Sequence, residues 1–529
     1  MKVSEEKRYE NLSPFELKNK LIEISNTNHE RMMLNAGRGN PNWLATEPRQ
    51  SFFQLGLFSV EESLREEDLP TLGTAPQKEG IAKRLDSFID KHMDLPGVVF
   101  LKNALGYVYD ELKIEPDSFV HELVDAMLGD HYPEPDRILT NAETVINKYL
   151  DQEMCAGTPP SGKFDLFATE GGTAAMDYIF TSLIENKLLH KGDKIALGTP
   201  IFTPYLEIPH LNDYEFVELE LKQDENSNWQ YPDSEIEKLA DPSVKAFFLV
   251  NPSNPSSVAM HQGSLDKIAN LVKTQRKDLI ILTDDVYGTF VNGFKSLAAV
   301  APHNTILVYS FSKYFGCTGL RLGVIAIHED NVFDKMIAKL PEKDRAELYK
   351  RYETVILNPN KMKLVERMVA DSRSVALHHT AGLSTIMQVQ MMLFSLYCLV
   401  DKKGDYKKSV QYIVNHRFKT LYSAIGIPCP NNPLDAYYYT TVDIPALAKT
   451  RYGEDFAKNL VNKHEPIDFV IQLAERKSIV LMDGGGFAAP EMSVRVSLAN
   501  LPNKSYEEIG KGISEVLEEY YQEWRSSKK

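Results

Sequence analysis

One lysine of this chain follows a predicted strand and is flanked by small hydroxyl side chains. Lys313 ends the run Ser310-Phe311-Ser312-Lys313, directly after an apolar, β-type stretch, and Arg321 lies eight positions later. An amine at this place can form a Schiff base with an aldehyde, while Ser310 and Arg321 hold a phosphate. The spacing therefore predicts a covalent site for pyridoxal 5′-phosphate (PLP), with Ser312 beside the lysine. The alternative is a surface lysine in a glycine-rich loop.

Two adjacent aspartates end another predicted strand, at residues 279–283. Asp284 and Asp285 are followed by Tyr287. A carboxylate at the pyridine nitrogen of PLP keeps that nitrogen protonated, so that the ring can accept a carbanion's electron pair. Adjacent side chains on extended backbone point to opposite faces, so only one aspartate can do this. We predict Asp284, because the phenol of Tyr287 would then reach the O3′ oxygen of the ring; a solvated turn is the alternative.

Three further loops supply groups that a PLP site needs. Asn254 lies in the stiff loop Asn-Pro-Ser-Asn-Pro, from which its amide can bond the ring oxygen. Gly171, Gly172 and Thr173 precede a helical segment, whose free N–H groups would cradle a phosphate. Phe202 is placed to stack on the pyridine. The alternatives are an ordinary Asn-Pro turn, a flexible helix entry and a core aromatic.

These loops share one position relative to the predicted strands. Four apolar runs, near residues 195, 247, 280 and 307, each lead into such a loop, and helical segments such as 264–273 lie between them. In an α/β sheet, ligands bind at the carboxyl ends of the strands. The loops are therefore expected to meet at one site.

In this order, the motifs resemble the fold-type I PLP enzymes of the aspartate aminotransferase superfamily. The patterns N-P-x-N-P, D-x-x-Y, S-x-S-K and G-x-R-x-G fall between about residues 165 and 330. The resemblance implies an α/β fold: a large domain with a mostly parallel sheet sandwiched by helices, and a small α+β domain built from both chain ends. It also implies that Arg495 binds the substrate α-carboxylate, and that Tyr132 reaches the phosphate of the partner subunit's cofactor, which requires a homodimer.

Four stretches are similar to a narrower family, the bacterial aspartate 4-decarboxylases, which are bifunctional aspartate aminotransferase/decarboxylases. They are NAGRGNPN (35–42), EGGTAAM (170–176), FTPYLEIP (202–209) and SFSKYFG (310–316). This resemblance implies β-decarboxylation of L-aspartate to L-alanine and CO₂, side aminotransferase activity, and larger assemblies of dimers.

The glycine-flanked loop of the first stretch is expected to line the substrate pocket, together with Asn254. Gly37 lets the backbone approach a ligand closely, and Arg38 could hold the β-carboxylate of aspartate. A solvated loop arginine is the alternative for Arg38.

Two other functions compete with decarboxylation. A conventional aminotransferase or β-lyase would share the fold, and a PLP-binding transcription regulator would share the cofactor domain. The regulator would need a basic DNA-binding head, which the first 50 residues lack. The net charge of −15 argues against nucleic acid and anionic membranes as partners.

Composition is typical of a globular enzyme, with 43% hydrophobic residues among 529. The four cysteines are scattered, which favours reduced thiols in a cytoplasm, and neither they nor the histidines have metal-ligand spacing, so no metal is expected. The start of the chain has no apolar signal core. Gln388 and Gln390 interrupt the apolar segment 383–400, which favours a buried helix over a membrane span.

We expect three parts along the chain. Residues 1–154 would be an N-terminal segment whose extra helices contribute to the small domain and the subunit interface. Residues 155–375 would be the large PLP-binding domain, with a helical insertion at about 334–374. Residues 376–529 would form the C-terminal small domain. A capping box at Ser13 predicts the first helix, and the chain is expected to close with a helix over residues 505–524.

Overall fold

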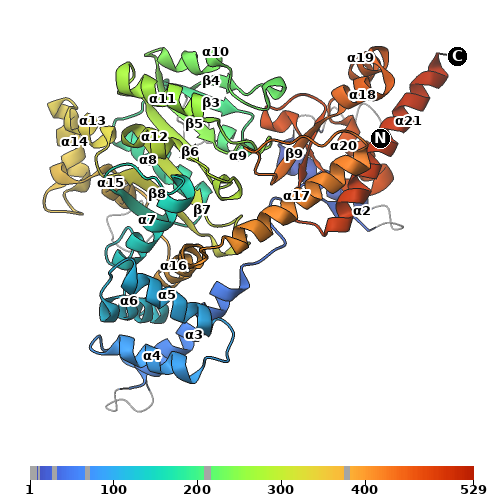
Figure 1. Cartoon of the computed structure of the whole chain (residues 1–529). Coiled ribbons are helices and arrows are strands. Elements are labelled where there is room, and N and C mark those ends of the chain that lie inside the picture. The colour runs from blue at the N-terminus through green and yellow to red at the C-terminus, as the bar shows by residue number, and fades with distance from the viewer. Residues whose placement is uncertain are drawn as a thin grey trace.

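The computed structural model describes residues 9, 12–26, 32–65, 72–207, 216–373 and 382–528, and a seven-stranded sheet lies at its centre (Figure 1). The strand order is β2-β8-β7-β6-β5-β3-β4; β8 runs antiparallel to both of its neighbours and the other pairs are parallel. The strands are β2 (Phe164–Thr169), β3 (Lys194–Thr199), β4 (Val217–Lys222), β5 (Val244–Val250), β6 (Ile280–Asp284), β7 (Thr305–Ser310) and β8 (Gly323–His328). The predicted mostly parallel sheet is confirmed.

Helices cover both faces of this sheet. Along β5, Ala246 and Phe248 pack in the core that includes α8 (Gly172–Glu185), whereas Phe247 and Leu249 pack in the core that includes α11 (Gln262–Thr274). Short helices α10 (Asp233–Glu237) and α12 (Leu297–Val300) join the second core. Because strand side chains alternate, an unbroken apolar run is buried only where both faces are covered. The sheet sandwiched by helices that the family resemblance implied is confirmed.

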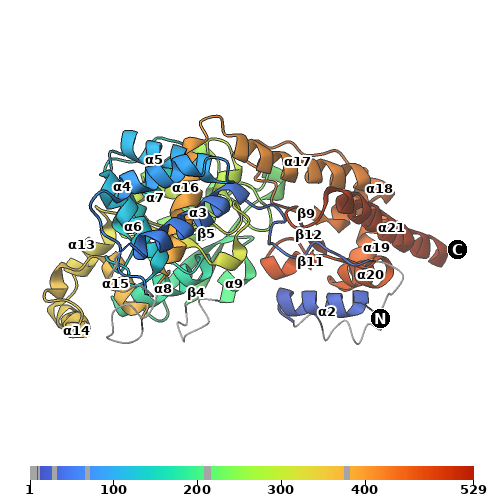
Figure 2. The ribbon, with the colours of Figure 1, turned by 90° about the horizontal axis from the view of Figure 1, so that it is seen from below.

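A helical group lies beside the sheet, drawn in blue to cyan in Figures 1 and 2. It consists of α3 (Thr46–Ser63), α4 (Ile81–Lys91), α5 (Val98–Asp110), α6 (Pro116–Leu128) and α7 (Thr140–Met154). The orange helix α16 (Thr385–Val400) packs against α3, α5, α6 and α7. Its predicted burial is confirmed, and among the described residues no helix is both long and apolar enough to span a membrane.

Both ends of the chain meet in a second, smaller unit (Figure 1). Its strand β1 (Leu34–Asn35) pairs with β10 (Ile479–Val480), and β11 (Met482–Asp483), β12 (Ser493–Ser497) and β9 (Tyr439–Asp443) form an antiparallel sheet. Its helices are α2 (Pro14–Asn26), α17 (Asp405–Ile425), α18 (Ile444–Tyr452), α19 (Glu454–Lys463), α20 (Asp468–Lys477) and α21 (Asn503–Ser527). The small α+β unit from both chain ends is confirmed.

The first helix begins with the predicted capping box. The Ser13 backbone N–H donates to the Glu16 carboxylate (3.1 Å), and the Glu16 N–H donates to the Ser13 hydroxyl (3.3 Å).

The predicted insertion forms three helices at the edge of the large unit, drawn in yellow in Figure 1. They are α13 (Val332–Ala338), α14 (Glu342–Tyr352) and α15 (Leu364–Asp371). Asp371, on α15, connects α14 and α8, because its carboxylate accepts hydrogen bonds from the hydroxyls of Tyr352 on α14 (2.9 Å) and Ser182 on α8 (2.7 Å). The domain boundaries at residues 154 and 375 stay a prediction, although α16 beyond the second boundary packs with helices that precede the first.

Candidate active site

The loops that follow β2, β3, β5, β6 and β7 enclose a cavity of about 530 Å³ together with residues of the second unit. Most of the residues singled out from the sequence line it. These are Gly37, Arg38, Gly172, Thr173, Phe202, Asn254, Asp284, Tyr287, Ser310, Ser312, Lys313, Arg321 and Arg495. Gly171 lies directly behind the lining, and Tyr132 lies elsewhere.

One end of the cavity has the donors that a phosphate dianion needs. Helix α8 begins there at Gly172, and the hydroxyl of Ser310 donates to that of Ser312 (3.0 Å). Arg321 lies so close to Gly171 that a Cβ at Gly171 would be 2.5 Å from the Arg321 Nη2 atom. A helix N-terminus, two hydroxyls and a guanidinium together fit a phosphate.

Asp284 lies at the end of β6 on the cavity wall and is buried. The hydroxyl of Tyr205 donates to its Oδ2 atom (2.6 Å), and the N–H of Val286 donates to its Oδ1 atom (3.1 Å). Burial raises the pKa of Asp284 to about 6, although these two hydrogen bonds and the charge of Lys313 act in the opposite direction. A desolvated carboxylate whose orientation is fixed by two hydrogen bonds is suited to face a protonated ring nitrogen.

The neighbouring Asp285 is outside the cavity lining. It accepts a hydrogen bond from the hydroxyl of Thr283, and burial raises its pKa to about 7. The two aspartates therefore face different surroundings, as the alternation along the strand predicts.

Lys313 extends into the cavity from the loop after β7. Its Nζ atom lies 3.4 Å from the carbonyl oxygen of Gly39. A Cβ at Gly39 would collide with the Tyr439 hydroxyl, which accepts a hydrogen bond from Tyr287 (3.2 Å). The glycine-flanked loop thus approaches both the lysine and these tyrosines closely.

Arg495, on β12, is a buried guanidinium with only neutral partners. Its Nη1 atom donates to Asn254 Oδ1 (3.2 Å) and its Nη2 atom to the carbonyl oxygen of Gly37 (2.8 Å), while its Nε atom has no partner in the described part of the chain. The rings of Tyr439 and Phe487 lie 4.3 and 4.7 Å from its Cζ atom. Burial lowers the pKa of Arg495. A carboxylate would supply the missing charge partner.

The cavity is strongly cationic, in contrast to the acidic chain as a whole. Its charged lining consists of five cations and one carboxylate: Lys18, Arg38, Lys313, Arg321, Arg495 and Asp284. Burial and the charges of Arg38 and Arg495 lower the pKa of Lys18. Such a lining attracts ligands with several negative groups.

Some lining residues were missed in the sequence. Tyr205 lies within a stretch that carried the family resemblance, so it could have been found. Phe15, Lys18 and Tyr439 gave no local signal, because they come from the second unit. Phe15 packs edge-on against Phe202, with ring centroids 6.1 Å apart, so α2 contributes to the cavity lining.

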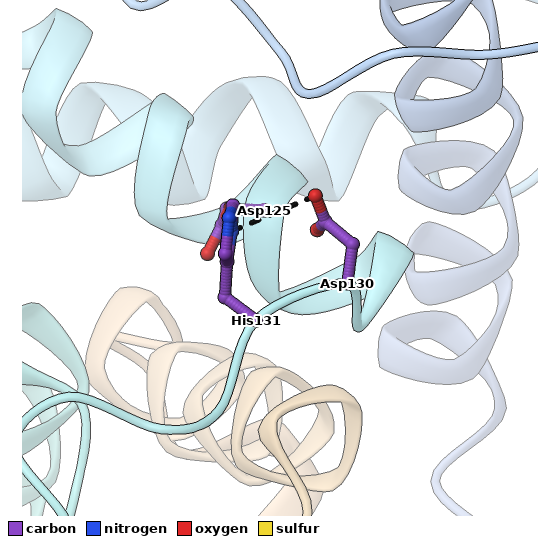
Figure 3. A group of neighbouring side chains, drawn as sticks. All are labelled: Asp125, Asp130 and His131. Atoms are coloured by element: carbon purple, nitrogen blue, oxygen red, sulfur yellow. Dashed lines mark hydrogen bonds and ion pairs between the residues drawn. The ribbon is translucent and has the colours of Figure 1, made fainter.

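Tyr132 lies between α6 and α7 and is 70% exposed. Beside it is a group of exposed side chains, in which the Nδ1 atom of His131 lies 2.6 Å from Asp125 and 3.5 Å from Asp130 (Figure 3). The hydrogen bond to Asp125 and both carboxylate charges raise the pKa of His131. Because the predicted contact of Tyr132 is with a second subunit, it stays a prediction.

Comparison with known proteins gives three principal results. The family model for class I and II aminotransferases matches residues 165–513. A bifunctional aspartate aminotransferase and L-aspartate beta-decarboxylase from a Pseudomonas species is 48% identical over 518 residues, which is 98% of each chain. Among solved structures, a single mutant of Thermus thermophilus aspartate aminotransferase has a TM-score of 0.61 at 14% identity, covering 96% of this chain and 97% of its own; at that identity it is similar in fold alone.

Proposed function

The chain belongs to the class I and II aminotransferases, and on that premise we propose that it decarboxylates L-aspartate at Cβ, releasing L-alanine and CO₂, with aspartate transamination as a side reaction. The membership confirms the family resemblance found in the motifs. The assignment of the substrate rests on the cavity lining of five cations and one carboxylate, which suits a phosphate together with a dicarboxylic amino acid. The close relative over the full chain supports the same substrate.

PLP is the proposed cofactor. Members of this family depend on it, and the cavity has donors for its phosphate, a carboxylate for its ring nitrogen and an amine for its aldehyde. The residues proposed to hold it are Lys313 at the aldehyde, Gly171, Gly172, Thr173, Ser310, Ser312 and Arg321 at the phosphate, Asp284 at the ring nitrogen, Asn254 and Tyr287 at O3′, and Phe202 at the ring face. When bound, PLP supplies a carbonyl that condenses with amines and a ring that accepts the electron pair released at the substrate Cα.

Three side chains would act directly on the substrate and the cofactor. Arg495 binds the α-carboxylate with two parallel hydrogen bonds, a geometry that lysine cannot reproduce. The amine of Lys313 removes the Cα proton as general base and returns a proton later. Asp284 keeps the proton on the ring nitrogen, so that the released electron pair is stabilised.

Water decides which product forms. Release of the oxo acid, oxaloacetate, consumes a water molecule, whereas loss of the β-carboxylate as CO₂ does not. Phe15 and Phe202 pack against each other in the lining of the cavity, and the Tyr439 ring lines it as well. Excluding water at these apolar surfaces would favour decarboxylation.

A product assay tests this function. Purified enzyme with PLP and L-aspartate is expected to release alanine and CO₂ in equal amounts without any added oxo acid. A conventional aminotransferase would instead need an oxo-acid co-substrate and would release only oxo-acid products. Failure to detect CO₂, with steady transamination when an oxo acid is added, would exclude the decarboxylase proposal.

Arg38 is proposed to hold the β-carboxylate, because it lines the cavity with Lys18 and Arg495. Arg38→Ala is then expected to slow aspartate decarboxylation about tenfold, which corresponds to one charge-assisted contact. Half-transamination of alanine should stay unchanged, since alanine has no β-carboxylate. Single-turnover rates with both amino acids check this. Equal effects on the two substrates would remove Arg38 from the β-carboxylate site and favour the alternative stated for it, a solvated loop arginine.

A homodimer is the proposed minimal unit, with larger assemblies of dimers. Helix α3 supports it: Phe53, Leu57, Val60 and Leu64 are spaced along one helical face and are all more than half exposed. Sedimentation of the active enzyme is expected to give at least a dimer, and Tyr132→Phe should weaken PLP binding by removing the partner's phosphate contact. A monomer with full activity would rule out both statements.

A cytoplasmic location is proposed as well. All four cysteines are free thiols, and three of them are buried. Cell fractionation would test this.

A further inference from the structure

The backbone that follows Lys313 is held by segments remote in the sequence. The Trp43 Nε1–H donates to the carbonyl oxygen of Tyr314 (3.0 Å), and the Tyr406 hydroxyl donates to the same oxygen (2.7 Å). The N–H of Ala45 donates to the carbonyl oxygen of Phe315 (3.2 Å). Donors from the segment just before α3 and from α17 therefore act on the two residues that follow the lysine.

Arg49, on α3, completes this set. Its Nη1 atom donates to the carbonyl oxygens of Ala45 (2.5 Å) and Phe315 (3.2 Å), and its Nη2 atom donates to that of Gly316 (2.8 Å). Within the described part of the chain it forms no ion pair, and its Cζ atom lies 5.1 Å from the centre of the Phe394 ring. Burial lowers the pKa of Arg49. Its hydrogen-bonding capacity is thus directed at backbone carbonyls, two of which follow the lysine.

The two segments also fit each other closely. Gly316 has a φ of +62°, and a Cβ there would collide with the carbonyl oxygen of Trp43. The ring of Phe315 stacks on that of Phe394, with centroids 4.8 Å apart. The loop therefore has little freedom to shift without breaking several contacts at once.

Lys313 itself makes few contacts that could hold its amine. In the described residues, the one hydrogen bond of the Lys313 Nζ atom is the 3.4 Å contact to the carbonyl oxygen of Gly39. A long, flexible side chain of this kind is positioned mainly by the backbone from which it extends. The placement of the Lys313 amine in the cavity thus depends on the hydrogen bonds, including those from Arg49, that hold the backbone carbonyls after it.

We propose that Arg49 is a positioning residue for Lys313. This inference rests on the proposed function, in which Lys313 is both the covalent attachment point and the general base. Arg49 touches neither substrate nor cofactor; it acts by fixing the carbonyls of Phe315 and Gly316. The helices that precede the large domain would then have a role inside the active site, in addition to any role in assembly.

The test compares Arg49→Gln with a matched variant, Arg276→Gln. Like the half-buried Arg49, Arg276 donates to backbone carbonyls, those of Leu239 (2.8 Å) and Val244 (2.6 Å). Arg276 is more deeply buried, pairs with Asp278 (3.0 Å) and lies at the amino-terminal end of the strands, away from the cavity. Four quantities would be measured for each variant. They are kcat and KM for aspartate at saturating PLP, the rate of PLP uptake by the apoenzyme, followed by absorbance, and the temperature of thermal unfolding.

For Arg49→Gln, kcat is expected to fall about 10- to 100-fold, because a small misplacement of a reacting group has effects of this size. KM should change little, since Arg495 still binds the substrate, and PLP uptake by the apoenzyme should slow. Arg276→Gln should lower the unfolding temperature while kcat and PLP uptake stay near the wild-type values. Arg49→Lys, which can reach one carbonyl, should recover part of kcat.

Two results would overturn the inference. The first is wild-type kcat and PLP uptake in folded Arg49→Gln. The second is equal losses in the Arg49 and Arg276 variants, which would indicate a general effect on stability. Failure of the proposed function looks different, because the wild-type enzyme itself would then release no alanine and CO₂ from aspartate.

Discussion

Lys313→Ala is expected to abolish the absorbance of the lysine-bound cofactor, together with decarboxylation and transamination of aspartate. The covalent attachment point and the general base are lost together, so the rate should fall by at least ~10³-fold, towards the upper end of what one acid–base group contributes. Absorbance spectra with added PLP and initial rates of CO₂ and alanine release measure this. Because the Lys313 side chain makes only a long contact to Gly39, the fold itself should survive the change.

Lys313→Arg is the matched control for charge. It keeps a cation in the cavity but has no amine that can condense with an aldehyde, so it should be as inactive as the alanine variant. Borohydride reduction of the wild-type enzyme followed by peptide mass analysis should place the cofactor on residue 313. A reducible absorbance that persists in both variants would assign the attachment to another lysine.

The second large effect is expected at Asp284. Asp284→Asn keeps the size of the side chain but cannot keep the ring nitrogen protonated, so kcat should fall at least ~10²-fold even with PLP bound. The amide oxygen can still accept the hydrogen bond from Tyr205, whereas the one from the Val286 N–H is lost because an amide nitrogen does not accept. Rates at saturating PLP separate this loss from weaker cofactor binding.

Asp285→Asn provides the internal comparison. This side chain is buried like that of Asp284, and burial raises its pKa to about 7, so its carboxyl group is about half protonated near that pH and mostly protonated below it. An amide of the same size should therefore cost little activity. A larger loss at Asp285 than at Asp284 would reverse the assignment of the two carboxylates.

The motifs of the sequence could predict the catalytic edge of the sheet because each motif is local. A strand and the loop that follows it are adjacent in the chain, so β7 with Lys313 and β6 with Asp284 can each be recognised in a short window. The carboxyl ends of parallel strands then meet at one edge. The cavity contains these groups together, and the fold class and family agree with what the motifs predicted.

The tertiary structure alone decided which distant residues complete the site. Phe15 packs edge-on against Phe202, and Arg49 bonds Gly316 across 267 positions. The family resemblance had already assigned Arg495 to the site, and the structure adds its hydrogen bond to Asn254. No spacing rule connects such pairs, because their contact depends on how α2, α3 and β12 pack against the sheet edge. The same holds for α16, which follows the large domain in the chain and packs with the helices before it. Local pattern specifies elements and loops, whereas the packing of buried side chains specifies which of them meet.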